Sequence, residues 1–328
     1  MDRRRFLTQG ARQGAAALAV ATAAGSPFAQ SGFPDRPVRI VVPFPPGGSV
    51  DALARHIAQR LTGVFGQNVV VENKAGGNSV IGSDAVAKSK GDGYVLLVNA
   101  GNLVINQHLL KTPYDLERDF TPVSLLAKGA LIVCLTPGLP VRTFPELVAH
   151  AKANPGKLNF AIGSVGSGGH IATELLKGRT GTDLFVLPYK GSQPAFVDLI
   201  SGQIQGMVEP ALGVMPLVKS GRIRAVAVTS SSRLKALPDV PTVAESGVAG
   251  FEFYAWYGLW APGGTPPDVV ARLNVEVNRI LAEAELKDRL ADQGFDTQNV
   301  SPTEFGRFVT ADYQSVGKII RDAHIKAQ

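Results

Sequence analysis

The sequence predicts an α/β protein with mostly parallel sheets, and two observations carry this prediction. A short β-branched run, a Gly-rich loop and an amphipathic segment follow one another four times along the chain. Such alternation favours parallel strands, because a connecting helix returns the chain to the same end of the sheet. Two units precede residue 100 and two lie between residues 155 and 203, which indicates one sheet in each of two domains. With 328 residues, 45% of them hydrophobic, the chain can bury both cores.

The first unit begins with a predicted strand over residues 38–42, followed by a loop over 43–48. Ser49 is a candidate N-cap for the next helix, because its hydroxyl can accept a hydrogen bond from a backbone N–H of the first turn. One face of that helix is predicted to be buried, since apolar residues recur in it at helical spacing: Val50, Leu53, Ala54, Ile57 and Leu61.

Three further units repeat this order. Their strands are predicted over residues 68–72, 158–162 and 185–189, and the loops after them over 75–78, 163–169 and 190–192. The helices that follow contain Ile81, Ala85 and Val86 in the second unit, run from His170 to about Lys177 in the third, and contain Phe196, Leu199 and Ile200 in the fourth. Ligands of α/β proteins collect at the carboxyl ends of parallel strands, so all four loops are candidate binding loops.

The C-terminal tail is predicted to form helices over residues 267–293 and 302–323, which we expect to pack back on the first domain. The aromatic tract 251–260 before them contains both tryptophans and is more typical of core or hinge packing than of a stacking platform. No long Pro/Ser linker separates the two predicted sheets. We therefore expect strands that cross between the domains rather than a flexible tether.

The first 29 residues have the layout of an export signal. A basic start precedes the small apolar run 15–24, and Ala29 offers a cleavage site. Arg3, Arg4 and Arg5 fit a twin-arginine signal, with the Sec route as the alternative. Removing this segment lowers the formal net charge from +6 to about +3, too little for a nucleic-acid partner. No later apolar run could cross a bilayer, so we expect a mature protein in the periplasm.

Most catalytic and cofactor signatures are absent. No loop matches a P-loop or a dinucleotide-binding motif, and the five histidines lack paired metal spacing, so we expect no cofactor and no metal. Ser167 and Ser192 both lack the first glycine of a nucleophile elbow. Cys134 lies in an apolar run and is predicted to be a small buried hydrophobe rather than a reactive thiol. We accordingly predict no catalytic residue.

The Gly-rich loops instead offer backbone N–H groups at helix starts, where unpaired donors and the helix dipole favour a carboxylate. A purely structural role in tight turns is the alternative for any single loop. Lys190 could add a positive charge, and His170 could donate a hydrogen bond or serve as a structural cap. Asp51, in the first turn of its helix, favours capping and dipole stabilisation over general-base chemistry.

Several motifs resemble those of one bacterial receptor family. The sequence PDRPVRIVVPFPPGGSVD at residues 34–51 is similar to the opening of the Bug family, the substrate-binding proteins of tripartite tricarboxylate transporters. Further similar segments occur in the family's order, at residues 70–78, 92–94, 113–115 with 119–120, 186–191 and 237–242.

The resemblance implies a two-domain, type II periplasmic-binding-protein (Venus-flytrap) fold with the ligand cleft between two mostly parallel sheets. Domain 1 would comprise residues 30–128 and 254–328, domain 2 residues 129–253, with crossings near 125–131 and 251–257. Carried over residue by residue, the resemblance implies these ligand-binding positions: Phe44, Gly47, Gly48, Ser49, Asp51, Asn78 and Ala100 on one wall, and Ser164, Gly166, Ser167, His170, Lys190, Gly191 and Glu209 on the other.

The function implied is that of a periplasmic, non-catalytic receptor, which captures a small mono-, di- or tricarboxylate for the membrane subunits of a tripartite tricarboxylate transporter. We expect a monomer. An exported enzyme acting on a carboxylated substrate, with Ser167 or His170 recruited for catalysis, is the alternative. The chain departs from the family at residues 208–210, where Val-Glu-Pro replaces the usual Asp-Asn pair, and at residues 79–80 after the second loop. These departures lie at the cleft and leave the identity of the ligand open.

Overall fold

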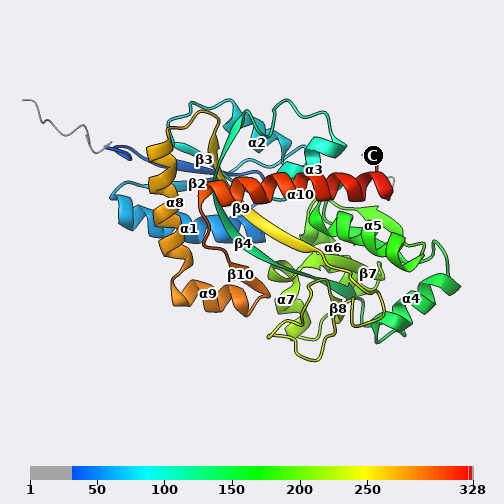
Figure 1. The fold of residues 1–328 in the computed structure, drawn as a ribbon. Coiled ribbons are helices and arrows are strands. Elements are labelled where there is room, and N and C mark those ends of the chain that lie inside the picture. Colours follow the sequence, from blue (N-terminus) through cyan, green and yellow to red (C-terminus); the bar gives the residue numbers. More distant parts are fainter. Residues whose placement is uncertain (1–31, 324, 327–328) are drawn as a thin grey trace, which may run out of the picture. The chain divides into compact units, whose positions relative to one another are not determined.

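A computed structural model describes residues 32–323 and 325–326, so the predicted export signal over residues 1–29 lies outside the described residues. From Pro34 onward the chain forms one compact α/β unit (Figure 1). Its strands are β1 (Val38–Val42), β2 (Val69–Asn73), β3 (Val95–Ala100), β4 (Phe120–Leu135), β5 (Asn159–Ile162), β6 (Phe185–Pro188), β7 (Gly206–Pro210), β8 (Arg224–Val228), β9 (Tyr254–Pro262) and β10 (Phe295–Thr297). Its helices are α1 (Ser49–Phe65), α2 (Val80–Ala87), α3 (Asn102–Leu109), α4 (Phe144–Ala153), α5 (Gly168–Thr180), α6 (Ser192–Ser201), α7 (Ala211–Lys219), α8 (Pro267–Leu281), α9 (Ala284–Ala291) and α10 (Pro302–Asp322).

The strands follow the order β2-β1-β3-β9-β4-β7-β5-β6, and β8 and β10 also pair with β4. Both ends of this order are parallel, because β1 pairs in parallel with β2 and β3, and β5 with β6 and β7. The centre is antiparallel, since β9 pairs with β3 and β4, and β4 with β7. The predicted α/β class is confirmed, and the sheet is more mixed than expected because long strands join the two parallel ends.

The long strand β4 carries the chain from one parallel end to the other. Its residues 120–130 pair with β9, whereas residues 131–135 pair with β7. On the edge opposite β9, residues 127–129 of β4 pair with β10, and on the edge opposite β7, residues 132–135 pair with β8. We call β1, β2, β3, β9, β10 and the first part of β4 the first half-sheet, and β5 to β8 with the last part of β4 the second half-sheet.

Two helix boundaries differ from the sequence-based expectation. Gly48, not Ser49, is the N-cap of α1, and Ser49 is already helical. The helix predicted over residues 267–293 is two helices, α8 and α9, separated at Ala282 and Glu283. Ala282 donates its backbone N–H to carbonyls of α8, and Glu283 is extended as the N-cap of α9. Periodicity alone did not show this break, because apolar residues continue on both sides of it.

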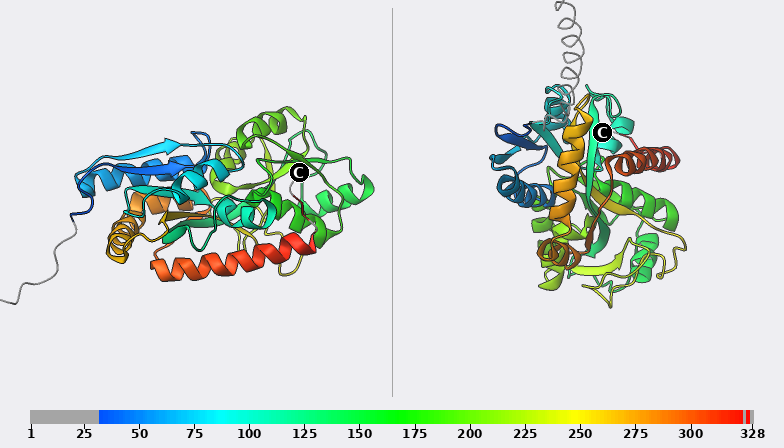
Figure 2. Two further views of the ribbon diagram at one scale, coloured as in Figure 1. Left: turned by 90° about the horizontal axis from the view of Figure 1, so that it is seen from above. Right: turned by 60° about the vertical axis from the view of Figure 1, so that its left-hand side comes forward.

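Part of the aromatic tract before the tail is core, as predicted, whereas its residues 253–257 also line a cavity. Trp260 is 1% exposed, and its ring lies against Trp256 and Phe305 at centroid distances of 5.9 and 5.2 Å. Phe305 is on α10, so the tail packs on the first half-sheet. The last turns of α10 do more than predicted, since Val316 and Ile320 also pack with Ile171 of α5. In Figure 2, α10 accordingly runs along one side of the molecule from the first half-sheet toward α5.

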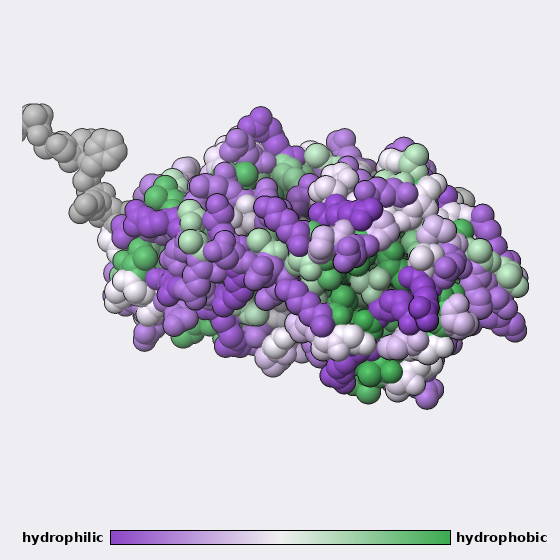
Figure 3. Space-filling view, turned by 90° about the horizontal axis from the view of Figure 1, so that it is seen from below, coloured by the Kyte–Doolittle hydropathy of each residue, from purple (hydrophilic) through white to green (hydrophobic). Residues whose placement is uncertain are grey.

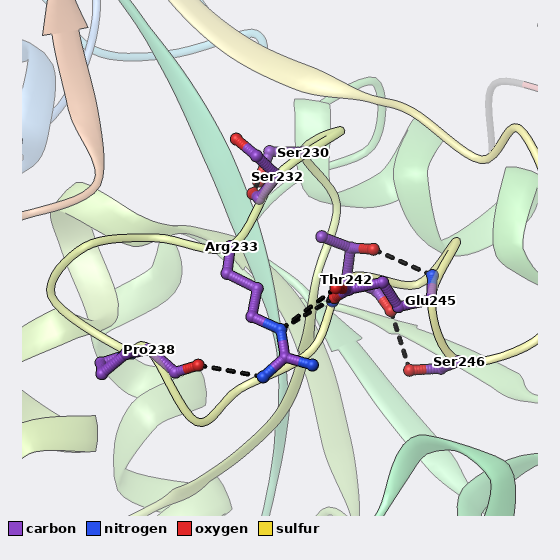
Figure 4. A network of polar contacts seen from close by, with 7 residues as sticks. All are labelled: Ser230, Ser232, Arg233, Pro238, Thr242, Glu245 and Ser246. Atoms are coloured by element: carbon purple, nitrogen blue, oxygen red, sulfur yellow. Dashed lines mark hydrogen bonds and ion pairs between the residues drawn. The ribbon is translucent and has the colours of Figure 1, made fainter.

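A polar network holds the connection between β8 and β9 (Figure 4). Arg233 donates to both carboxylate oxygens of Glu245, at 3.2 and 3.0 Å, and to the carbonyl of Pro238 at 3.0 Å. Glu245 in turn accepts from the backbone N–H of Thr242 at 2.7 Å. The segment 237–242, one of the family-like motifs, is therefore fixed by its neighbours rather than by the cleft.

Cys134 is completely buried in β4, as predicted, and burial raises the pKa of its thiol. Among the residues that the structure describes, no helix combines the length and apolarity needed to cross a membrane. Within the same part of the chain, no three His, Cys, Asp or Glu side chains are placed to hold a metal ion.

Candidate ligand cleft

A cavity of about 670 Å³ lies where loops of the two half-sheets meet. From the first half-sheet it is lined by the loop before α1 and the start of α3, and from the second by the loops before α5, α6 and α7. Ser49, Asn102, Gly168 and Ser192 line it and are the first residues of their helices. Unpaired N–H groups and positive helix dipole ends are thus gathered around one space.

Ten of the predicted binding residues line this cavity. Those contributed by the first half-sheet's loops are Phe44, Gly47, Gly48, Ser49 and Ala100. Those contributed by the second are Ser164, Ser167, Lys190, Gly191 and Glu209. The structure thus brings together positions up to 165 residues apart in the sequence, and it places four others behind the cavity wall: Asp51, Asn78, Gly166 and His170.

Asp51 fixes the shape of the first loop. Its carboxylate accepts from the Gly47 N–H at 3.0 Å, from Arg55 at 2.9 Å and from Asn73 at 2.8 Å. Asn73 also donates to the carbonyl of Phe44 at 3.2 Å. Burial acts to raise the pKa of Asp51, but the hydrogen bonds from Arg55, Gly47 and Asn73 outweigh it and hold the pKa below its usual range. This carboxylate is ionised, and most of its hydrogen bonds go to groups outside α1. It therefore holds the first loop, whereas the sequence favoured capping and dipole stabilisation.

Asn78 and Gly166 meet each other from opposite sides. The Asn78 amide donates to the carbonyl of Val165, and also to Asn106 at 2.9 Å. Gly166 has φ +73°, and a Cβ there would lie 3.1 Å from the Asn78 amide nitrogen and 3.3 Å from Ile105. The loop before α2 and the loop before α5 are therefore in direct contact beside the cavity, with no room for a side chain at position 166.

His170 stabilises the loop before its own helix. Its Nδ1 accepts from the backbone N–H of Gly166 at 3.0 Å, which leaves the ring proton on Nε2. Burial is the main cause that lowers the pKa of His170, so the ring is neutral at neutral pH. Ser167 is the N-cap of α5, because its hydroxyl accepts from the His170 N–H at 3.2 Å.

Glu209 is the one predicted residue that brings a buried carboxyl group to the cavity. It is 9% exposed, and Ser192 donates a hydrogen bond to its Oε1 at 2.7 Å. Burial raises the pKa of Glu209 to about 7, although the bond from Ser192 acts in the opposite direction.

The polar residues of the cavity wall that were not predicted include Ser192, Tyr257 and Asp312. The loop 190–192 already pointed to Ser192, and the aromatic tract to Tyr257. Asp312 had no local signal, since it is one acid within the amphipathic helix α10. Burial raises the pKa of Asp312 to about 6, while a hydrogen bond from Trp256 and the charge of Lys128 act to lower it.

Much of the wall is apolar. Its apolar side chains come from loops and helices beside both half-sheets, from β9 and the residue before it, and from α10: Phe44, Pro45, Ile105, Phe196, Leu212, Phe253, Trp256 and Val316. Seen from below, the surface is mostly hydrophilic, with hydrophobic residues gathered around a hollow in the right-hand half (Figure 3). Such a cleft suits a ligand with a carboxylate and an apolar body.

Comparisons with known proteins agree on one group. The model of a family described as "Tripartite tricarboxylate transporter family receptor" matches residues 53–325. The protein BugT of Bordetella pertussis is 37% identical over 311 residues, which cover 94% of this chain and 95% of BugT. The structure of Rpa4515 of R. palustris with adipate is 35% identical, has a TM-score of 0.85, and is matched over 90% of this chain and 99% of that one. MatC of Rhodopseudomonas palustris with bound malate is 31% identical, has a TM-score of 0.82, and is matched over 88% and 100%.

Proposed function

This chain belongs to the tripartite tricarboxylate transporter family of receptors, and on that basis we propose that it captures a small organic carboxylate in its cleft, in the periplasm, for the membrane subunits of such a transporter. Relatives of known structure carry dicarboxylates, adipate in one and malate in another. No comparison supports the alternative of an exported enzyme, so the receptor is proposed to be non-catalytic.

The observation that carries this proposal is the gathering of four helix starts around one cavity. Helices α1, α3, α5 and α6 all begin at its wall, from both half-sheets. Their first N–H groups can hold a carboxylate without a catalytic side chain, and Lys190 adds a positive charge at the same wall. A ligand held from both sides stabilises the form in which the two walls are close.

We assign the direct ligand contacts to the ten predicted residues that line the cavity. The other four act from behind it: Asp51 and His170 hold the first and third loops, and Asn78 contacts the loop of Gly166. The domain boundaries implied by the family, residues 30–128 with 254–328 and residues 129–253, fit the change of partners along β4 at residues 130–131. Export by the N-terminal signal, the membrane subunits as partners and the monomeric state belong to the same proposal.

Calorimetry with a panel of mono-, di- and tricarboxylates tests this function. We expect one-to-one saturable binding of at least one of them, with the ligand recovered unchanged. Lys190→Met keeps the aliphatic stem and removes the charge, so affinity should fall about 10- to 100-fold, as for the loss of one charge-assisted hydrogen bond. Lys157→Met, an exposed lysine outside the cavity, is the matched control and should bind like the wild type. Turnover of the ligand, or no binding by any carboxylate, would contradict the proposal.

A further inference from the structure

Glu209 is an acid in a cavity that is proposed to bind an anion, and an ionised carboxylate there would repel the ligand. Its carboxyl group lies at the end of β7, next to the starts of α5 and α6. A Cβ on Gly169 would lie 3.8 Å from Oε2, and Ser192 is bonded to Oε1. An acid of the protein itself thus occupies the place where the helix starts of the second half-sheet converge.

No cation of the described chain neutralises this carboxyl group. None of the ion pairs among the described residues includes Glu209, and Ser192 provides the one hydrogen bond to its side chain that they contain. Among the described residues that line the cavity, Lys190 is the single Lys or Arg, against two acids, Glu209 and Asp312. If both acids were ionised, the side chains of the wall would carry a net negative charge and repel a carboxylate.

We propose that Glu209 meets the ligand as a neutral carboxylic acid, donates a hydrogen bond from Oε2 to the ligand's carboxylate, and takes up a proton from solvent on binding wherever it is ionised in the free receptor. The inference rests on the proposed function, which makes the ligand an anion. No covalent bond forms, because the proton adds to a carboxylate oxygen and is then shared in a hydrogen bond between acid and carboxylate. Glu209 thereby becomes the residue that couples affinity to pH.

The other titratable groups around Glu209 do not replace it in this role. From β4 and β9, Cys134 and Tyr257 face it, and burial raises the pKa of both, so both remain neutral. From the loop before α6 comes Lys190, and from α5 His170, whose pKa is lowered by burial. Asp312, on α10, is the remaining cavity acid and therefore the control.

The pH dependence has a definite sign. Burial raises the pKa of Glu209 to about 7, so the free receptor is mostly protonated at pH 6 and mostly ionised at pH 8. A bound anion favours the protonated form further. Ligand carboxyl groups of ordinary pKa stay ionised over this range. Affinity should therefore fall about tenfold from pH 6 to pH 8, with proton uptake rising from about 0.1 to about 0.9 per ligand.

Calorimetry in two buffers of different ionisation enthalpy measures this uptake directly, on the full mature chain and with the tightest binder of the carboxylate panel. Glu209→Gln should still bind, take up almost no proton and show affinity independent of pH. Asp312→Asn should keep the wild-type uptake at pH 8 and lose only the uptake that Asp312 itself contributes near pH 6. Tm measurements on both variants show whether each is folded.

The outcomes separate this inference from the function on which it rests. Binding without proton uptake, or uptake that survives in Glu209→Gln and disappears in Asp312→Asn, would overturn the role of Glu209 and leave the receptor function intact. If an aminocarboxylate bound more tightly as the pH rises, Glu209 would be an ionised partner of the ligand's ammonium group. That result would also overturn the role of Glu209 as a neutral acid. Failure of every carboxylate to bind at any pH would remove both proposals.

Discussion

At the scale of single residues, Asp51 illustrates how a first-turn acid can serve a neighbouring loop more than its own helix. Asp51 is 3% exposed, and its carboxylate accepts from donors in the loop before α1, in α1 itself and at the end of β2. Only the bond from Arg55 is local to the helix. The helix dipole also favours an acid here, but three hydrogen bonds at short distance are the larger contribution.

Asp51→Ala should therefore lower both stability and ligand affinity. The Gly47 N–H and the Asn73 amide lose their acceptor, and we expect a loss of about 1–3 kcal/mol in the free energy of unfolding. Asp268→Ala removes an exposed first-turn acid from α8 and serves as the control for the dipole alone, with an effect below about 1 kcal/mol. Urea denaturation measures the free energy of unfolding of both variants. Equal losses would mean that Asp51 contributes only through its interaction with the helix dipole.

At the scale of elements, the start of α5 shows which glycines the cleft requires. A Cβ on Gly169 would lie 2.3 Å from the carbonyl oxygen of Val208 in β7, whereas one on Gly168 would meet nothing nearer than Phe253 at 3.9 Å. Both have φ values open to any residue, so the difference is one of space. Gly169 lets the helix start approach β7 and the carboxyl group of Glu209.

Gly169→Ala is expected to push α5 away from β7 and to lower the free energy of unfolding by about 1–3 kcal/mol, the usual cost of overpacking. Gly168→Ala, one residue earlier in the same turn, should change stability by less than about 0.5 kcal/mol. Thermal denaturation of the pair measures this contrast. Equal stability of the two variants would mean that α5 and β7 can separate without cost.

At the scale of the whole chain, the contact between Asn78 and the loop of Gly166 couples the two half-sheets. The amide of Asn78 donates to Val165, and Gly166 packs against Ile105 and Leu109 of α3. These contacts join the two walls of the cavity in the arrangement that the structure shows. They favour the same arrangement as a ligand gripped from both sides, so they contribute to closure independently of the ligand.

Asn78→Ala should shift the free receptor toward an open form. We expect a larger radius of gyration by small-angle scattering without ligand, a decrease to the wild-type value with saturating ligand, and an affinity up to about tenfold lower. Asn154→Ala, which removes only a bond to the carbonyl of His150 within one helix end, is the control. A radius that ligand leaves unchanged in every variant would refute closure.

Much of the architecture could be predicted from local patterns. The four strand-loop-helix units lie where periodicity placed them, with boundaries shifted by up to three residues, and part of the aromatic tract is core. The predicted helix boundaries were wrong where two alternative boundaries have the same local sequence signal. Ser49 and Gly48 are both common N-caps, and the apolar pattern of 267–293 continues through the break at Ala282 and Glu283.

The sequence by itself determined the α/β class, the family and the loops that form the cleft, because periodicity, turn residues and motifs are local properties of the chain. Only the tertiary structure decided which loop residues face the cavity. In the folded chain, Asp51 and His170 hydrogen-bond to the loops before their own helices and lie behind the cavity wall. Asp312 reaches the wall from α10, and Glu209 is buried with no cation of the described chain paired to it. The burial of a side chain and the net charge of a site depend on residues that are far apart in the sequence, so a local sequence pattern cannot predict them.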